Sequence, residues 1–434
     1  MTKKLRRFLA LTLAIAMALT MFTACGSTEA ENDTDVMEDE EDMTEVSDET
    51  TEAASWLAAW GTSMQTVWSS DTIPSEATSG ETVTIRQQIR PSVSGEELRF
   101  TLSNQYGSTD LVIDSMEIAM LLDPTSYEID TDTSVVVTYE GSTTIVVPAG
   151  ETIVTDSVEF SYSALDDIAV SMEISSMPST ITLHRASRCT NWIITGSHVG
   201  DNDWSGASTY AMWYFLAVMD VMADPDCAAI VCLGDSLTDG ASITENSFTR
   251  YTDTLMELMQ ADDELSSYSI INMGVGGTPF LGTYDNSTGL GRVTRDIVNI
   301  SGVKYCVVLM GVNDIGGATT DISADIIAGY ESLVEQCHEA GIQVIGCTIT
   351  PFNGNSYYSE LHEQIRLTVN EYIMSDDSAF DGYVDLASAV ASESDSSKMD
   401  SSYVSTWNDY LHFNATGYGL LGTTIYNYLK DFIS

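Results

Sequence analysis

Polar and apolar positions alternate with a period of two through much of the first half of the chain. Leu98, Phe100 and Leu102, for example, alternate with polar residues and precede a turn sequence. Side chains along a strand point alternately to the two faces of a sheet, so each such run predicts a strand. Further runs lie at residues 83–89, 145–147, 168–174 and 181–183. Because no helical pattern interrupts them, residues 55–222 are predicted to form an all-β, jelly-roll-like sandwich domain.

From residue 227 onward, apolar runs alternate with helical patterns. Ile326, Tyr330 and Cys337 recur on one helical face, and Gly341 is placed to end that helix. A second helix is predicted at 361–372, and strands at 228–233, 268–271, 305–310, 342–347 and 383–386. Alternating strands and helices predict a parallel sheet with helices on both faces. We therefore expect residues 227–434 to form a flavodoxin-like, three-layer α/β/α domain.

The first 54 residues have the composition of an export signal and a spacer. Four basic residues precede the apolar run 8–24, a layout typical of a signal peptide. Small residues before Cys25 resemble a bacterial lipobox, so residues 1–24 are predicted to be a lipoprotein signal peptide and Cys25 the lipidated residue. An ordinary signal peptide cut nearby is the alternative. Residues 25–54 are acidic and contain no aromatic residue, which predicts a disordered tether.

The charge of the chain limits its partners. Cleavage after residue 24 removes four basic and no acidic residues, taking the formal net charge from −49 to −53. Such a charge argues against nucleic acid and against anionic lipid surfaces as partners. We expect an exported protein, lipid-anchored at the outer face of a bacterial cell membrane or secreted, that touches the membrane through its anchor alone. A neutral substrate, such as an esterified polysaccharide or oligosaccharide, suits this charge.

The cysteines do not predict a metal site. Six remain beyond Cys25, and their spacing is not that of a zinc site. Cys232, Cys306 and Cys347 lie inside apolar strand predictions, where buried free thiols are expected. We therefore predict neither a metal nor a cofactor.

Candidate chemistry begins where the predicted strand 228–233 ends, at Gly234, Asp235 and Ser236. Open α/β sheets bind their ligands at the carboxyl ends of strands, which is where Ser236 would lie. Ser after Gly-Asp is also common in ordinary turns, with Asp235 bracing the turn. The significance of Ser236 therefore depends on the residues downstream of it.

Three further groups lie downstream, in order. Residues 274–277 hold three glycines just past a predicted strand, where backbone N–H groups can approach a ligand closely. Asn313 comes after the strand 305–310, and its amide can donate to a developing oxyanion. Asp409 stands three residues before His412, close enough to fix the imidazole tautomer. Together these groups supply a nucleophile, a base, an orienting carboxylate and oxyanion donors.

This order resembles the SGNH hydrolases, also called the GDSL esterase/lipase family. The resemblance implies that Ser236 is the nucleophile, His412 the base and Asp409 its partner. It implies an oxyanion hole formed by the N–H of Ser236, the N–H of Gly277 and the amide of Asn313. Gly274 and Gly276 are alternatives to Gly277. Members of the family usually have Pro after the catalytic His, whereas this chain has Phe413.

The resemblance extends to the β region. Secreted bacterial members with an N-terminal β domain carry Trp-x-x-x-Trp-Gly-x-Ser, which is found here at residues 56–63. Three more of their patterns are present, at residues 84–87, 102–107 and 292–296. The two arginines and the aspartate of 292–296 could shape the pocket or simply pair with one another on the surface. We expect their role to be structural. Trp213 and Tyr214 are expected to seal the junction between the two regions.

The resemblance implies a serine esterase that hydrolyses carboxylic esters through an acyl-enzyme. We expect short acyl groups, such as acetyl, on carbohydrate. Three alternatives remain: a lipase or phospholipase acting on longer acyl chains, a glycan-binding lipoprotein, and a transferase that moves acyl groups onto glycans with the same triad. A thioesterase is disfavoured by the predicted export.

Overall fold

The computed structural model describes residues 54–282 and 287–433. The predicted signal peptide, the lipidation site Cys25 and all but the last residue of the predicted tether lie outside these ranges. Among the described residues, no helix is both long and apolar enough to cross a membrane. We call residues 54–223 the β region and residues 227–433 the α/β region.

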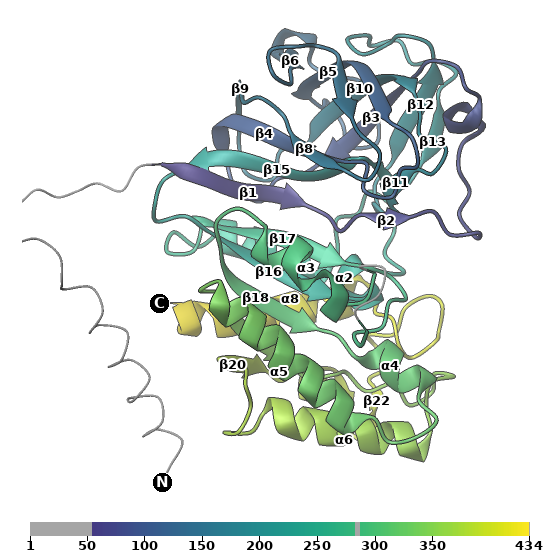
Figure 1. Cartoon of the computed structure of the whole chain (residues 1–434). Coiled ribbons are helices and arrows are strands. Elements are labelled where there is room, and N and C mark those ends of the chain that lie inside the picture. Colours follow the sequence, from purple (N-terminus) through teal and green to yellow (C-terminus); the bar gives the residue numbers. More distant parts are fainter. Residues whose placement is uncertain (1–53, 283–286, 434) are drawn as a thin grey trace, which may run out of the picture. The chain divides into compact units, whose positions relative to one another are not determined.

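The β region consists of two main antiparallel sheets and a small third one (Figure 1). The first has the order β1-β15-β4-β8, with β9 also paired to β4, and the second has the order β13-β12-β3-β10-β5-β6, with β7 paired to β5. The third has the order β14-β11-β2. The strands are β1 (Ser55–Gly61), β2 (Gln65–Thr66), β3 (Val83–Ile89), β4 (Gly95–Ser103), β5 (Leu111–Met120), β6 (Val135–Val137), β7 (Ile145–Val147), β8 (Thr152–Val154), β9 (Val158–Tyr162), β10 (Ile168–Ser176), β11 (Thr182–His184), β12 (Asn191–Thr195), β13 (Ser208–Tyr210), β14 (Trp213–Tyr214) and β15 (Leu216–Ala223).

Strand β3 departs from the simple alternation, because its polar positions are buried as well as its apolar ones. Arg86 is fully buried and donates hydrogen bonds to Ser171 Oγ (2.9 Å) and to the carbonyl oxygens of Tyr127, Val199 and Asp201 (2.6, 2.8 and 3.0 Å). Burial lowers the pKa of Arg86 to about 10. A polar residue on a strand therefore need not be exposed to solvent where loops cover that face of the sheet and supply hydrogen-bond acceptors.

The α/β region contains a five-stranded sheet of order β17-β16-β18-β19-β20, with every neighbouring pair parallel. This is the flavodoxin-like order, as predicted. Its strands are β16 (Ala228–Gly234), β17 (Tyr268–Gly274), β18 (Val303–Leu309), β19 (Gln343–Cys347) and β20 (Gly382–Val384). The last strand is shorter than the predicted 383–386, because the Asp385 side chain accepts from Ser388 N and caps the helix that begins at Leu386.

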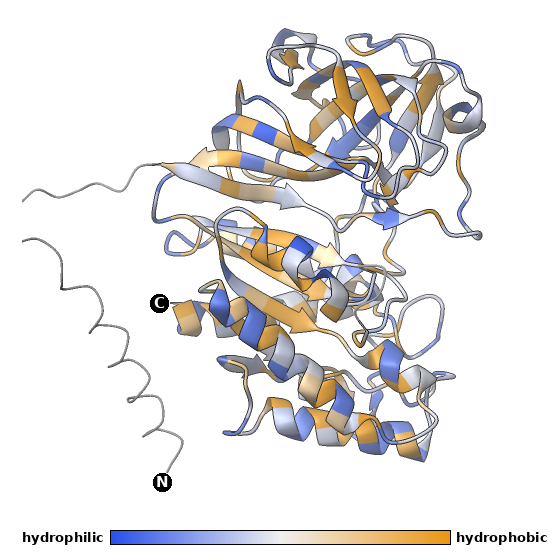
Figure 2. Cartoon of the chain, in the orientation of Figure 1, coloured by the Kyte–Doolittle hydropathy of each residue, from blue (hydrophilic) through white to orange (hydrophobic). Residues whose placement is uncertain are grey.

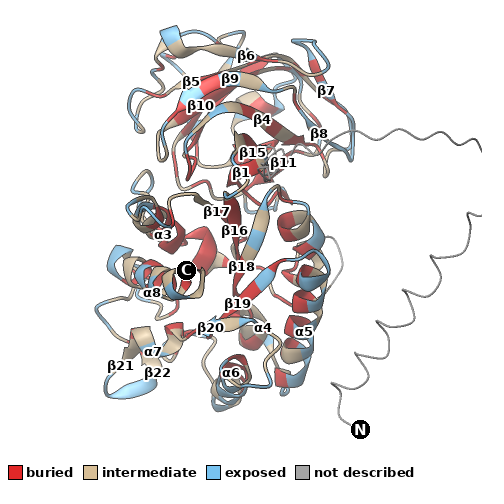
Figure 3. Ribbon diagram, turned by 90° about the vertical axis from the view of Figure 1, so that its left-hand side faces the viewer, coloured by how far each residue is buried: buried red, intermediate tan, exposed pale blue. Residues whose placement is uncertain are grey.

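Helices cover both faces of this sheet (Figures 1 and 3). Alternate side chains of β16 point to opposite faces of the sheet. Ile230 and Cys232 pack with helices α3 and α8, whereas Val231 and Leu233 lie on the side of α5. Figure 2 shows apolar residues concentrated in the sheet and on one side of the helices. The α-helices are α2 (Ser236–Asp239), α3 (Tyr251–Gln260), α4 (Val312–Gly317), α5 (Ser323–Glu339), α6 (Glu360–Ile373), α7 (Leu386–Val390) and α8 (Ala415–Ile433).

Short elements complete the two regions. These are the 3₁₀ turns η1 (Ser75–Thr78), η2 (Thr131–Thr133) and η3 (Leu290–Arg292), the π-helical turn η4 (Thr294–Val298), and the hairpin of β21 (Ala391–Ser392) and β22 (Asp395–Met399). Gly341 lies after α5 with φ of +76°, in the helix-ending position that the sequence predicts.

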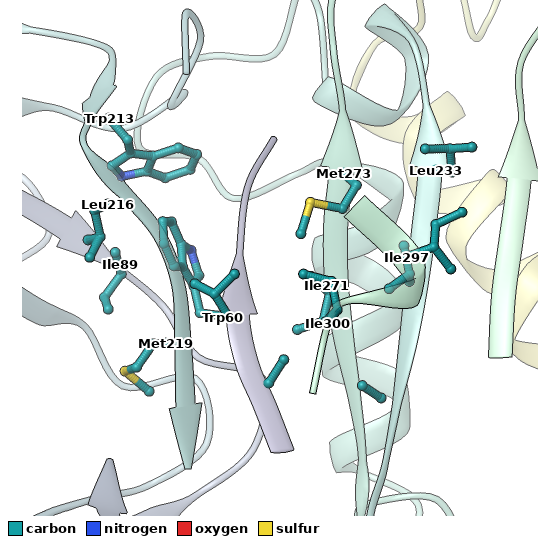
Figure 4. Packing of buried hydrophobic residues seen from close by; sticks show 14 of the residues in the cluster. Trp60, Ile89, Trp213, Leu216, Met219, Leu233, Ile271, Met273, Ile297 and Ile300 are labelled. Carbon is teal, nitrogen blue, oxygen red and sulfur yellow. The ribbon is translucent and has the colours of Figure 1, made fainter. Parts of the chain in front are cut away.

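The two regions share one hydrophobic core. Trp60 of β1 packs edge-on against Trp213, with ring centroids 5.0 Å apart, on the β-region side of its strand (Figure 4). Ile271 and Met273 of β17 lie on the other side of β1, where a Cβ on Gly61 would be 3.0 Å from Ile271 Cγ2 and 3.1 Å from Met273 Cε. Hydrogen bonds accompany this packing: Ala58 N donates to Ser301 O (3.0 Å), and Ser269 Oγ to Ala58 O (2.6 Å). Trp213 and Tyr214 are both buried in this core.

The cysteines of the described residues are all free, and Cys232, Cys306 and Cys347 are buried as predicted. Burial raises the pKa of each of these thiols. They act as small apolar side chains in the core of the sheet.

Candidate active site

Ser236 lies at the sharp turn where β16 passes into the short helix α2. Gly234 is needed at this turn, because a Cβ there would lie 1.8 Å from Thr238 Oγ1. Asp235 caps α2, and its Oδ1 accepts from Leu237 N at 3.0 Å. Asp235 is buried, and this burial raises its pKa to about 7. Its contacts fit the predicted role as the brace of the turn.

Ser236, His412 and Asp409 form one hydrogen-bonded chain. Ser236 Oγ lies 3.0 Å from His412 Nε2, and His412 Nδ1 lies 2.6 Å from Asp409 Oδ2. Asp409 Oδ1 also accepts from the backbone N–H of His412 at 3.0 Å. Burial raises the pKa of Asp409, but the hydrogen bonds from His412 outweigh it and hold the pKa below its usual value. An ionised Asp409 keeps the Nδ1 proton in place and leaves Nε2 free to accept the proton of Ser236.

The loop before His412 is conformationally strained. Asn408 and Tyr410, on either side of Asp409, have φ of +52° and +53°. Positive φ is uncommon for residues other than glycine and is unfavourable for a bulky side chain such as Tyr. This backbone turns Asp409 back towards His412, three positions further along.

The glycines after β17 differ in what they can donate. Gly274 N already donates to Asn272 Oδ1 at 2.9 Å, and a Cβ on Gly274 would lie 2.2 Å from Asp239 N. Its role is to let α2 pack closely on β17. Gly276 and Gly277 line the pocket beside Ser236, and Gly277 has φ of +76°. They remain the two backbone candidates for the oxyanion hole.

Asn313 reaches the pocket from the first turn of α4. Its Nδ2 donates to Thr278 O at 3.0 Å, and its Oδ1 accepts from Tyr357 OH at 3.1 Å. These two contacts fix the amide orientation. A side-chain amide carries two N–H donors, so one remains for a ligand in the pocket that Asn313 lines. The neighbouring Asp314 accepts from the backbone N–H groups of Phe280 and Leu281 (2.7 and 2.9 Å), which is a structural role.

Arg292 and Asp296 form a buried support beneath the site. Arg292 donates to Gly234 O (2.7 Å), Met273 O (2.6 Å) and Asp296 Oδ2 (2.9 Å). Because Arg292 is fully buried, surface pairing is excluded for it and the structural role holds. Burial raises the pKa of Asp296, but Arg295 and Arg292 outweigh it and hold the pKa at about 2.

Several residues of the site were missed by sequence reasoning. The pocket around Ser236 is also lined by Gln65, Arg185, Ala186 and Arg188 of the β region and by Asp239, Ala241, Tyr357, Trp407 and Leu411 of the α/β region. Trp407 meets the His412 ring edge-on, with centroids 5.1 Å apart. Asp239 lies three residues after Ser236, and Trp407 and Leu411 lie beside or within the Asp409–His412 motif, so their closeness in sequence is the signal that could have found them.

The carboxylate of Asp239 joins α2 to the β region. Its Oδ1 lies 3.2 Å from His184 Nε2, and its Oδ2 accepts from Arg188 Nη2 at 3.2 Å. Burial raises the pKa of Asp239, but Arg188 and His184 outweigh it, so the pKa lies below its usual value. His184 is itself buried and also contacts Ser63 O (2.9 Å), a structural position away from the pocket lining. Among the described residues, no group of three or more His, Cys, Asp or Glu side chains is placed to hold a metal ion.

Comparison with known proteins identifies the α/β region. Residues 232–420 match the model of the GDSL-like Lipase/Acylhydrolase family. The resemblance inferred from the motifs is thereby confirmed for this part of the chain, and so is its assignment to a class of hydrolases. No curated protein matches the chain.

Solved structures similar to the chain each cover about half of it. The lipase/acylhydrolase from Enterococcus faecalis shares 20% identity over 47% of this chain and 96% of its own, with a TM-score of 0.37. Est24, a carbohydrate acetylesterase from Sinorhizobium meliloti, shares 16% identity over 47% of this chain and 99% of its own, with a TM-score of 0.36. A catalytic mutant of Axe2, an acetylxylan esterase from Geobacillus stearothermophilus, shares 18% identity over 47% of this chain and 93% of its own, with a TM-score of 0.35. These similarities are too distant to indicate a substrate.

Asn313→Ala tests the oxyanion role of this side chain. Loss of one such donor lowers turnover roughly 100- to 1,000-fold, because the donor acts on charge that develops in the transition state. We expect a fall of this size in kcat for an aryl acetate, with little change in KM, in steady-state kinetics. Tyr357→Phe, which only frees the amide to rotate, should cause a smaller fall. A change confined to KM would contradict the role.

Asp235→Asn tests the effect of burial on Asp235. Because burial raises the pKa of Asp235 from 3.8 to about 7, folding favours its protonated form. The stability that this group contributes is present below pH 3.8 and is lost as the pH rises through 7. Asn cannot ionise but keeps the oxygen that accepts from Leu237. The unfolding free energy of the variant, minus that of the wild type, should rise across this window and level off above it in urea titrations. A difference that is constant with pH would disprove the raised pKa.

Proposed function

Because residues 232–420 form a GDSL-like lipase/acylhydrolase domain, we propose that this protein is a serine esterase in which Ser236 forms an acyl-enzyme. The observation that carries the proposal is the chain from Ser236 Oγ through His412 to Asp409, which lies in an open pocket. A serine hydroxyl is a weak nucleophile until a neighbouring base accepts its proton. The 3.0 Å separation of Ser236 Oγ and His412 Nε2 supports that transfer.

In the proposed reaction, His412 Nε2 takes the proton of Ser236 as Oγ attacks the acyl carbonyl carbon. The carbonyl oxygen becomes an oxyanion that accepts from the N–H groups of Ser236 and Gly277 and from the Asn313 amide. His412 then gives its proton to the departing alkoxide, and the alcohol leaves. Water repeats the sequence on the acyl-enzyme: His412 takes a proton from water, hydroxide attacks, and the acid departs as Ser236 regains its proton. Asp409 stabilises the imidazolium in both halves.

The proposed substrates are short acyl esters, such as acetates, of carbohydrate. The pocket has a volume of about 330 Å³, near the lower end of the roughly 300–1,000 Å³ found for small-molecule sites. Among the described lining residues, Gln65, Arg185, Arg188 and Asp239 are polar or charged. A long acyl chain lying over these groups would desolvate them without replacing their hydrogen bonds, which is costly. A short acyl group on a hydroxylated alcohol avoids that cost.

We also propose that the enzyme acts outside the cell, tethered through lipidated Cys25 and residues 25–54. The support is the signal-peptide layout of residues 1–24 and the acidic composition of the tether. An acidic, extended spacer would hold the folded part away from an anionic membrane surface.

Acid release from defined esters tests the proposed function. The protein is the chain from residue 25 onward with Cys25→Ser, so that no lipid is attached, beside the same chain with Ser236→Ala. We expect acetate release from acetylated xylan and from short aryl esters, and its loss in Ser236→Ala because the nucleophile is gone.

Three results would contradict the proposal. Hydrolysis that persists in Ser236→Ala would remove the assigned nucleophile. Ser236-dependent hydrolysis of long-chain esters alone would indicate a lipase. Acetyl groups that appear on an added oligosaccharide acceptor rather than as free acetate would indicate a transferase.

A further inference from the structure

One wall of the catalytic pocket is built by the β region. Gln65 of β2 and Arg185 and Arg188, from the loop after β11, line the same pocket as Ser236. Trp68, in the loop after β2, lies beside Gly277: a Cβ on Gly277 would be 3.8 Å from Cη2 of the indole. The indole is therefore within one residue's width of the proposed oxyanion hole.

Trp68 is held in place by a network of contacts with Arg185 and Asp71. The Arg185 guanidinium lies over the ring, 3.7 Å from its centroid. Arg185 is fixed in turn by Asp71, which it meets through Nε at 2.8 Å and through Nη2 at 2.5 Å. Asp71 Oδ2 also accepts from Trp68 N at 2.7 Å, so Asp71 holds both the backbone of Trp68 and the arginine above its ring. A bidentate Arg–carboxylate pair of this kind fixes geometry well.

Trp68 is nevertheless 39% exposed. A rigid, exposed aromatic ring beside a nucleophile is a binding surface that needs no ordering on contact, so little conformational entropy is lost. The π face of an indole carries a partial negative charge and attracts polarised C–H groups. A pyranose ring offers such C–H groups on its faces and hydroxyls around its edge.

The polar neighbours of Trp68 suit the edge of a sugar. Gln65 has an amide donor and an acceptor, and Arg185 and Arg188 have guanidinium donors for hydroxyl oxygens. The two arginines are paired with Asp71 and Asp239, so the wall is polar without a large net charge. A neutral, hydroxylated ligand fits this wall better than an acyl chain or a strongly charged group.

The hollow continues beyond the catalytic pocket. A second pocket, of about 470 Å³, shares Arg185, Ala186 and Arg188 with the first. Its other lining residues are Ser70, Asp71, Thr72, Ala211, Met212, Ile243 and Glu245. We call these two pockets, with their three shared lining residues, the groove; together they offer more room than a single sugar needs.

From these observations we propose that the β region supplies the alcohol-side binding site of the esterase, with Trp68 as the surface on which the acylated sugar ring stacks. The neighbouring sugars of an oligosaccharide occupy the groove along Arg185 and Arg188. This inference rests on the proposed function and adds to it that the ligand is a neutral oligosaccharide bound across both regions.

The test compares two acetate esters in the Trp68→Ala variant. One is monoacetylated xylotetraose, and the other is ethyl acetate, whose alcohol is too small to stack. We expect the ratio of kcat/KM for xylotetraose acetate to that for ethyl acetate to fall at least tenfold, with Trp68→Phe in between. A tenfold fall in kcat/KM corresponds to about 1.4 kcal/mol of lost transition-state binding.

Trp56→Ala is the matched control. Trp56 of β1 also carries an arginine over its ring, with Arg99 at 4.2 Å from the centroid, but Arg99 lines neither pocket, whereas Arg185 lines both. Its removal should leave the ratio as in the wild type. The same fall in Trp56→Ala, or a change of less than threefold in Trp68→Ala, would overturn the proposal.

Measuring oligosaccharide binding distinguishes failure of this subsite from failure of the proposed esterase function. In the Ser236→Ala chain, calorimetry should detect xylotetraose, the deacetylated product, and Trp68→Ala added to that chain should abolish the signal. Binding that is equal with and without Trp68 overturns the subsite. Ser236-dependent hydrolysis of ethyl acetate together with an unchanged ratio refutes the subsite alone. Trp68-dependent binding without any hydrolysis keeps the subsite and refutes the esterase.

Discussion

The buried guanidinium of Arg292 joins the two strand ends that carry the candidate site. It donates to Gly234 O, two residues before Ser236, and to Met273 O, at the start of the glycine loop. A buried positive charge is tolerable only if a counter-charge and acceptors surround it, and removing one partner of such a group typically costs about 3–5 kcal/mol. The positions of the nucleophile and of the backbone donors are thus set by the same cation.

The counter-charge links this support to the β region. Asp296 pairs with Arg292 and accepts from Ser63 Oγ at 2.6 Å. A second polar link runs from His184 and Arg188 to Asp239 on α2. Together with the shared core around Trp60, these contacts make the β region part of the catalytic structure. A detached β region would leave Asp296 and Asp239 without part of their hydrogen bonding.

Much of this could be predicted from the sequence, because the informative signals are local. Apolar runs ended by glycine, as at Gly234, mark strand ends, and parallel strands bring such ends to one edge of a sheet. The spacing of Asp409 and His412 is likewise a local signal, and the structure brings these residues to Ser236. The strand at 383–386 was predicted too long because the capping contact of Asp385 competes with the apolar pattern.

The remaining features depend on contacts between distant parts of the chain. Ser63 and Asp296 are 233 positions apart, and nothing in the sequence pairs them, although each belongs to a pattern that was noticed. Arg185 lines the pocket and lies over Trp68 because the third sheet of the β region pairs β11 with β2 and so brings their loops together. Arg86 of β3 is buried for the same reason, because three of its acceptors are carbonyl oxygens of distant loops that periodicity does not describe.

The central claim is that Ser236 attacks the substrate after His412 accepts its proton. The most direct measurement is covalent trapping with diethyl p-nitrophenyl phosphate, a phosphorylating agent for activated serines, followed by mass spectrometry of the peptides. The account predicts one diethylphosphoryl group per chain, on the peptide that contains Ser236, and its loss in His412→Ala. Labelling at another residue, or hydrolysis that survives complete labelling of Ser236, would contradict it.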